Sequence, residues 1–174
     1  MKAAGYRDSV VRVIKILDKK DSLIQRIYPE MQMLPLSFGK DHDPPLSLSR
    51  SFVTGKNQNK LIYDDYYGEI VVADLNFDGL EDFGTPVDCG ADNGPHYAFY
   101  IQDRPFHFKF NRYLTDKVVW FPSEFNDSLK RFTTVVPCMV SLVGRTTFHF
   151  DSISNKWKKI SHHFIDYQTG KRMR

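Results

Sequence analysis

The chain has 174 residues, of which 41% are hydrophobic and 26% charged, and its formal net charge is +3. These values suit one soluble domain with a buried core. No apolar run approaches the ~18 residues that a membrane span needs, and the first residues contain no apolar stretch typical of a signal peptide. Basic residues form no stripe with interleaved aromatics, so nucleic-acid binding has no support.

The first apolar segment, residues 10–28, fits two structures. Five β-branched residues within residues 10–17 and the polar turn at residues 18–22 favour a β-hairpin. Four apolar residues also recur at helical spacing, namely Val10, Val13, Ile14 and Leu17. We favour the hairpin and place it in residues 1–36, at the start of a single β-rich domain that comprises residues 1–174.

The next segment, residues 37–60, has few apolar positions, four serines and the pair Pro44-Pro45. We expect a long exposed loop here, within the domain. Residues 61–168 are predicted to form the core, because short apolar or alternating runs there are bounded by turn residues. The predicted fold class is all-β, with antiparallel sheets in a propeller-like or meander arrangement and strands at 70–73, 83–87, 97–101, 106–110, 118–121, 132–136, 139–143 and 146–150.

The segment DLNFDGLED, residues 74–82, places oxygen donors at alternate positions between two predicted strands. Counted from Asp74, donors stand at positions 1, 3, 5 and 9, and Gly79 stands at position 6. This is the spacing of an EF-hand-like calcium loop, in which glycine permits the sharp turn and position 7 offers its backbone carbonyl. The predicted ligands of a Ca²⁺ ion are Asp74, Asn76, Asp78, Leu80 (through its carbonyl) and Asp82.

This loop differs from an EF-hand at its end and in its flanks. Position 12, a bidentate glutamate in the EF-hand, is Thr85, and strands replace the two helices. The sequence therefore predicts a weak site, with a Kd of ~0.1–1 mM as in extracellular modules. The simpler alternative is an acidic turn without an ion, since Asp, Asn and Gly form turns by themselves. We favour calcium, and prefer it to magnesium, which demands stricter octahedral geometry.

The loop also resembles the DxNxDGxxD calcium loops of FG-GAP and integrin-α-type propeller blades. The following TPVDCGADNGPHY (residues 85–97) and the later TTFHFDSISNKWKKI (residues 146–160) are similar to segments of a bacterial family of FG-GAP-like proteins with a single calcium loop. The resemblance covers residues 60–165. With one such loop, the chain departs from the many-bladed propellers.

Some members of that bacterial family are periplasmic immunity proteins that block secreted lysozyme-like effectors. The resemblance therefore implies a calcium-binding, non-enzymatic protein-interaction domain located in the periplasm, in the cell envelope or outside the cell. An inhibitor or immunity protein against a cell-wall hydrolase is the most specific function that it suggests. The ligands that it implies are the five residues already derived from the spacing.

Two other function classes stay open at this stage. A glycan-acting hydrolase would need two carboxyl groups across a cleft, for which Asp64, Asp65 and Asp92 are candidates. A carbohydrate-binding or adhesion module would instead align aromatic rings on an exposed surface. The sequence contains no HExxH, GxSxG, GxGxxG or phosphate-loop motif, which favours a protein without catalytic activity.

The stretch YDDYYGE, residues 63–69, is a candidate partner surface. Tyrosine offers a large contact area with one polar tip, and adjacent carboxylates could meet a basic partner. An edge strand with solvated acids is the simpler interpretation of the same stretch. The candidate contact residues are Tyr63, Asp64, Asp65, Tyr66 and Tyr67.

The cysteines and histidines give weaker indications. Cys89 and Cys138 could form one disulfide or stay free thiols, and the sequence leaves both open. A nucleophilic Cys89 would need a nearby base, such as His96, and we do not expect one. His162 and His163 are adjacent, so in a strand they would face opposite sides and would not share a metal ion.

Overall fold

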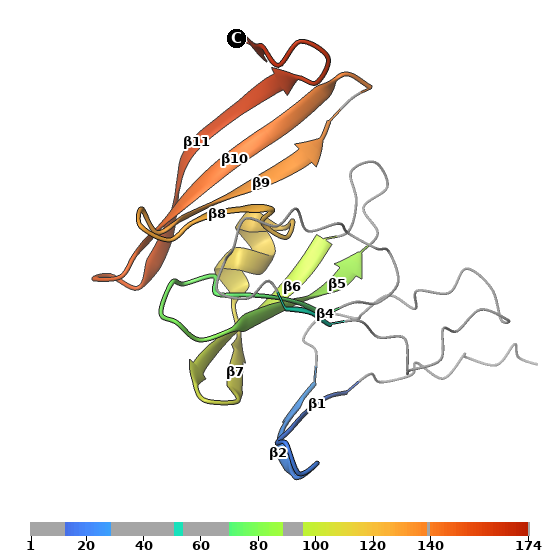
Figure 1. Cartoon of the computed structure of the whole chain (residues 1–174), viewed down its shortest axis with the longest axis vertical. Helices are drawn as coiled ribbons and strands as arrows, with labels where there is room; N and C mark the ends of the chain where they lie inside the picture. Colours follow the sequence, from blue (N-terminus) through green and yellow to red (C-terminus); the bar gives the residue numbers. More distant parts are fainter. Residues whose placement is uncertain (1–12, 29–50, 54–69, 89–95, 139, 174) are drawn as a thin grey trace, which may run out of the picture.

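The computed structural model describes residues 13–28, 51–53, 70–88, 96–138 and 140–173 (Figure 1). In these ranges the chain forms one two-stranded and two five-stranded sheets, with one short helical segment. All strand pairs except one are antiparallel. The predicted all-β fold class is therefore confirmed.

The N-terminal segment is a hairpin of β1 (Ile14–Leu17) and β2 (Leu23–Ile27), paired antiparallel. Its turn is held by the Asp18 carboxylate, which accepts the backbone N–H groups of Lys20 and Ser22, both at 2.8 Å. A side chain that binds the backbone of its own turn favours a hairpin over a continuous helix. The hairpin prediction is confirmed over the helical alternative.

The first five-stranded sheet has the order β3-β4-β5-β6-β7, so strands that follow each other in the chain lie side by side. The only parallel pair among the described strands is β3 with β4, and β3 lies within residues 37–60, for which the sequence predicts an exposed loop. The strands are β3 (Ser51–Val53), β4 (Ile70–Ala73), β5 (Asp82–Asp88), β6 (His96–Arg104) and β7 (His107–Phe110).

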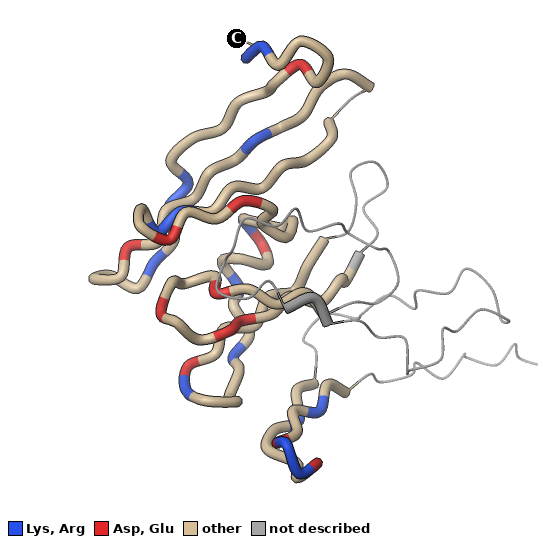
Figure 2. The backbone as a smooth tube through the Cα atoms, in the orientation of Figure 1, with Lys and Arg blue, Asp and Glu red and all other residues tan. Residues whose placement is uncertain are grey.

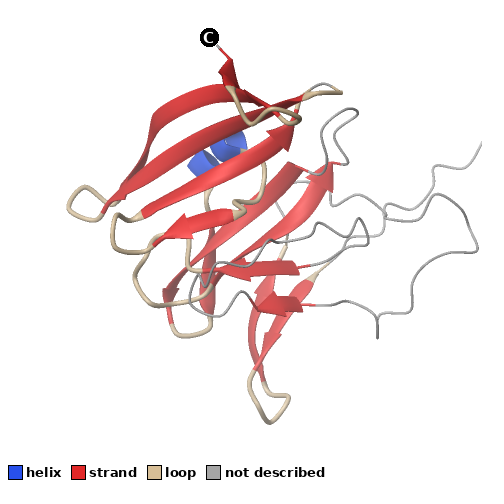
Figure 3. Ribbon diagram, turned by 45° about the horizontal axis from the view of Figure 1, so that its top comes forward, coloured by secondary structure: helices blue, strands red, loops and turns tan. Residues whose placement is uncertain are grey.

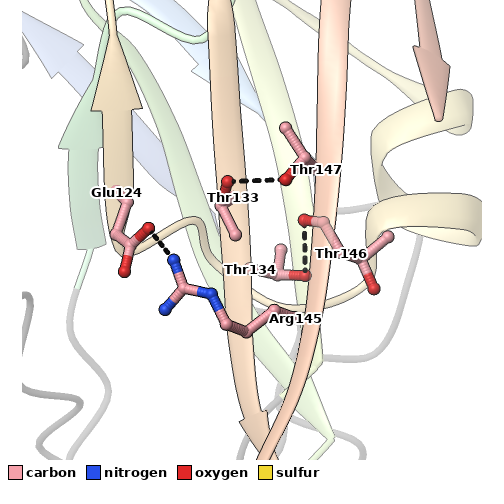
Figure 4. Close-up of polar contacts among 6 residues, drawn as sticks. All are labelled: Glu124, Thr133, Thr134, Arg145, Thr146 and Thr147. Carbon is pink, nitrogen blue, oxygen red and sulfur yellow. Dashed lines mark hydrogen bonds and ion pairs between the residues drawn. The ribbon is translucent and has the colours of Figure 1, made fainter. Parts of the chain in front are cut away.

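The second five-stranded sheet is an antiparallel meander in the order β12-β11-β10-β9-β8. Cross-strand polar pairs fix its register on one face: Arg145 forms an ion pair with Glu124, and the Thr133 and Thr147 hydroxyls are 3.0 Å apart (Figure 4). The predicted strand at residues 139–143 begins only at Leu142. The strands are β8 (Glu124–Asn126), β9 (Arg131–Pro137), β10 (Leu142–Asp151), β11 (Lys156–Asp166) and β12 (Arg172–Met173).

The strand predicted at residues 118–121 is wrong, because a short π-helix, η2 (Leu114–Val118), precedes an irregular segment there. The Asn111 side chain accepts the backbone N–H of Leu114 at 2.9 Å at the start of this helix. Leu114 and Val118, four residues apart, are both buried, which is the helical spacing of a core-facing stripe. The apolar residues of this segment thus enter the core from a helix and a loop.

The two five-stranded sheets share one apolar core, to which η2 contributes Leu114 and Val118. Figure 3 shows this helix behind the strands of the second sheet. Successive residues of a strand point to opposite faces of its sheet. In β6 the four successive residues 97–100 are all buried and apolar or aromatic, so the β3–β7 sheet is apolar on both faces. One face contributes to the main core, made of Val71, Ala73, Leu75, Tyr97, Phe99, Leu114, Val118, Phe121, Phe132 and Phe148. The other face packs against the β1–β2 hairpin around Ile27, Phe83, Val87, Ala98 and Tyr100.

Candidate metal centre

The acidic loop connects β4 to β5 and begins from an antiparallel pair in which Ala73 lies opposite Asp82. Two of its residues, Phe77 (φ 58°) and Gly79 (φ 88°), have the left-handed backbone conformation. Glycine adopts this conformation without strain, and it gives the sharp turn that the sequence predicts at Gly79. The loop is the green curve after β4 in Figure 1, and its acids are red in Figure 2.

Side chains of the acidic loop form hydrogen bonds with the backbone of the same loop. The Asp74 carboxylate accepts the N–H groups of Asp78 at 3.1 Å and of Gly79 at 2.8 Å. The Asp78 carboxylate accepts the N–H of Leu80 at 2.7 Å and the side-chain amide N–H of Asn76 at 2.8 Å. The same residues that would ligate an ion therefore shape the loop.

Asp82 is fully buried and joins the loop to the sheet. One carboxylate oxygen accepts the N–H of Leu75 and the other accepts the N–H of Gln102 in β6, both at 2.8 Å. Burial is the main cause that raises the pKa of Asp82 to about 8, and the charges of Asp74 and Asp78 act in the same direction, whereas the two N–H groups lower it. Burial likewise raises the pKa of Asp74.

The loop has the types of donor atom that calcium binds, but its side chains do not point toward a common centre. In the part of the chain that the structure describes, no three His, Cys, Asp or Glu side chains converge as a metal-binding cluster. The loop nevertheless offers hard oxygen donors, which calcium prefers, and each carboxylate oxygen retains a lone pair beside its N–H bond. Ion binding would need Asp74, Asp78 and Asp82 to turn toward one centre.

Trp157 of β11 clamps the loop from the second sheet, and the sequence analysis missed it. Its indole N–H donates to the carbonyl of Leu75 at 3.2 Å, and its ring packs against Phe150, with centroids 4.8 Å apart. A second contact joins the loop to this sheet, since the Phe77 and Phe125 rings are 6.5 Å apart. The two hydrogen-bonded residues are 82 positions apart, so no local pattern could have paired them.

Replacing Trp157 by Phe is expected to lower the free energy of unfolding by about 1 kcal/mol through loss of this hydrogen bond. Trp120→Phe is the matched control, because the Trp120 indole N–H is buried and has no hydrogen-bond partner among the residues that the structure describes. Denaturation in urea measures both variants. If Trp120→Phe costs as much as Trp157→Phe, ring size and not the bond to Leu75 explains the loss.

The metal-free protein is expected to lose stability as the pH rises between about 4 and about 8. The folded state keeps the proton of Asp82 up to a pKa of about 8, whereas the unfolded chain releases it near 3.8. The unfolded state then binds fewer protons, so the free energy of unfolding falls with pH. Melting curves in EDTA measure this slope. Asp82→Asn should be less steep over the same range, and an equal slope would contradict the assignment to Asp82.

Several predicted site residues lie outside the described ranges. These are the candidate partner surface, Tyr63, Asp64, Asp65, Tyr66 and Tyr67, and the further candidates Cys89 and Asp92. Cys138 carries a free thiol, which donates to the carbonyl of Val136. His162 and His163 pair with successive residues of β10 and so lie on opposite faces of the sheet, as predicted.

Comparisons with known proteins assign no family. No family model matches the chain, and no curated protein matches it. Among solved structures it is similar to one described as "Structure of a Xanthomonas Type IV Secretion System related protein", with 18% sequence identity and a TM-score of 0.48. The match covers 68% of this chain, which spans 62% of that protein's length. In the described residues, no helix is long and apolar enough to cross a membrane.

Proposed function

We propose that this chain is a calcium-binding protein-interaction domain without catalytic activity of its own. The observation that carries the proposal is the loop at residues 74–82, whose oxygen donors lie between two antiparallel strands with Gly79 in the left-handed conformation. Four carboxylates in nine residues repel one another, and the most buried of them, Asp82, has a strongly raised pKa. A bound cation would remove that repulsion.

Ion binding to the loop would order the neighbouring surface, because the loop is hydrogen-bonded to both sheets. Asp74, Asn76, Asp78, the Leu80 carbonyl and Asp82 would hold the ion, which supplies the positive charge that the loop lacks. Asp82 ties the loop to β6, and Trp157 ties it to β11. Occupancy would therefore stiffen the junction of the two sheets, and with it the surface beside the loop.

In its finer form, the proposal is an inhibitor or immunity protein against a lysozyme-like cell-wall hydrolase, acting in the periplasm, in the cell envelope or outside the cell. Its support is the resemblance of the loop and of residues 85–97 and 146–160 to the single-loop family. The acidic, tyrosine-rich stretch at residues 63–67 suits a basic partner.

Binding and inhibition assays against a panel of lysozyme-like hydrolases, with calcium and with EDTA, test this function. We expect at least one enzyme to be bound and inhibited, more strongly with calcium. Asp64/Asp65→Lys should abolish the inhibition, whereas Asp116/Asp127→Lys, with the same charge change at two exposed positions, should not. If no enzyme in the panel is bound, the inhibitor role is contradicted, while calcium binding is judged separately by the melting experiment.

A further inference from the structure

Two turns lie side by side at one end of the second sheet (Figure 1). They are the β8–β9 turn, residues 127–130, and the β10–β11 turn, residues 152–155. The Lys130 ammonium donates to the Ser152 hydroxyl at 3.0 Å, and the Phe150 N–H donates to the Lys130 carbonyl at 2.9 Å. These bonds hold the two turns together as one surface, which we name the turn pair.

Each turn presents an aliphatic side chain to solvent. Ile153 is 99% exposed and Leu129 is 50% exposed. Both positions are fixed by side chains that bind the local backbone: the Asp151 carboxylate accepts the Ile153 N–H, and the Asn126 side-chain amide oxygen accepts the Leu129 N–H, both at 3.0 Å. The exposure therefore belongs to ordered turns.

Basic residues surround these two tips. Arg131, His149 and Lys158 lie directly opposite one another on β9, β10 and β11, so their side chains share one face of the sheet. Arg131 and Lys158 are exposed, and charges of one sign in register repel each other. Three further basic residues lie in or next to these turns: Lys130 directly precedes β9, and Lys156 and Lys159 lie in the first residues of β11. Figure 2 shows blue segments at this end of the sheet.

The acids of the turn pair do not balance this charge. Residues 127–131 and 149–159 contain five Lys and Arg but only two acids, Asp127 and Asp151. The Asp151 carboxylate is engaged within its turn, where it also accepts the Ser154 hydroxyl at 2.7 Å. Arg131, His149 and Lys158 lie on the face of the sheet opposite to Trp157, which contacts the acidic loop. A net positive surface therefore remains on that face, beside the two aliphatic tips.

We infer that the turn pair docks on an anionic lipid bilayer. Projecting aliphatic side chains can enter the boundary between headgroups and acyl chains, while the bases around them meet the lipid phosphates. Single-stranded nucleic acid is a poorer fit, because it favours aromatic platforms for base stacking, and neither turn contains an aromatic residue. None of these residues belongs to the acidic loop, so the inference does not rest on calcium binding.

Co-sedimentation with vesicles tests the inference in the full chain. We expect binding to phosphatidylcholine vesicles that contain about one third phosphatidylglycerol, weakening with added salt, and little binding to pure phosphatidylcholine. The assay is run in EDTA, which separates this test from that of the metal site. Absence of binding to the anionic vesicles at low salt would overturn the inference.

Matched variants locate the surface. Arg131/Lys158→Glu should lower the vesicle partition coefficient about 25-fold or more, at roughly fivefold for each base removed. Lys20/Lys171→Glu changes the net charge equally at two exposed positions away from the turn pair, and should retain binding within about twofold. Ile153→Ser should weaken binding about tenfold through lost apolar burial. Melting curves establish that each variant is folded.

Two further outcomes would overturn the inference. If both double variants lose binding equally, net charge and not the turn pair attracts the vesicles. If poly(dT) displaces the vesicles completely while Ile153→Ser binds normally, the basic row is a polyanion site and the aliphatic tips play no part.

Discussion

About 10 mM calcium is expected to raise the melting temperature of the wild-type chain and to leave that of Asp78→Ala unchanged. An ion that binds only the folded state stabilises it by mass action. For a Kd of ~0.1–1 mM, the gain at this concentration is about 1.4–2.7 kcal/mol, or roughly 3–10 °C for a chain of this size. Differential scanning calorimetry measures both proteins.

Asp78 is the informative position because its side chain is exposed. Among the described residues its carboxylate accepts N–H groups from Leu80 and Asn76, both within the loop, so its removal should cost little stability without calcium. Asp116→Ala, an exposed acid on η2, is the control and should keep the full response. An equal rise for wild type and Asp78→Ala would place calcium elsewhere, and magnesium should give a smaller shift.

The second large effect is expected from Asp82→Ala, which should lower the free energy of unfolding in EDTA at about pH 4 by about 3 kcal/mol. At this pH the raised pKa of Asp82 carries little cost, so the lost hydrogen bonds dominate the difference. The substitution removes the acceptors of two N–H groups, those of Leu75 and Gln102, around a side chain with 0% exposure. Buried donors without acceptors cost about 1–3 kcal/mol each. Chemical denaturation gives the difference directly.

The series around Asp82 separates bonding from charge. Asp82→Asn keeps one oxygen acceptor but turns an amide N–H toward the other backbone donor, so its loss of stability should lie between wild type and Asp82→Ala. Asp116→Ala again serves as the surface control. If Asp82→Ala proves as stable as Asp116→Ala, the carboxylate does not hold the loop on β6.

Local patterns predicted the parts of the fold that depend on near neighbours. Alternating and β-branched runs placed β4, β5, β6, β7 and β9 near their observed positions, and the polar turn at residues 18–22 distinguished the hairpin from a helix. The pattern failed at residues 118–121, where an apolar run enters the core from the end of η2. Leu114, Val118 and Phe121 share one buried cluster with residues that are distant in the sequence, among them Phe148. The local pattern does not contain that information.

The sequence predicted which residues form the candidate site, but not the contacts that connect them to the rest of the fold. The spacing of Asp74, Asn76, Asp78 and Asp82 is visible in the sequence, and so is the turn at Gly79. The full burial of Asp82, its bond to β6 and the clamp by Trp157 all depend on contacts between distant segments. The parallel pairing of β3 with β4 was missed for the same reason.

A crystal structure grown in calcium, with anomalous difference maps, tests the central claim most directly. We expect a peak inside the loop at about 2.3–2.6 Å from its oxygen ligands, with the carboxylates of Asp74, Asp78 and Asp82 turned toward it. A loop without a peak at saturating calcium, its carboxylates still bonded to backbone N–H groups, would contradict a calcium site.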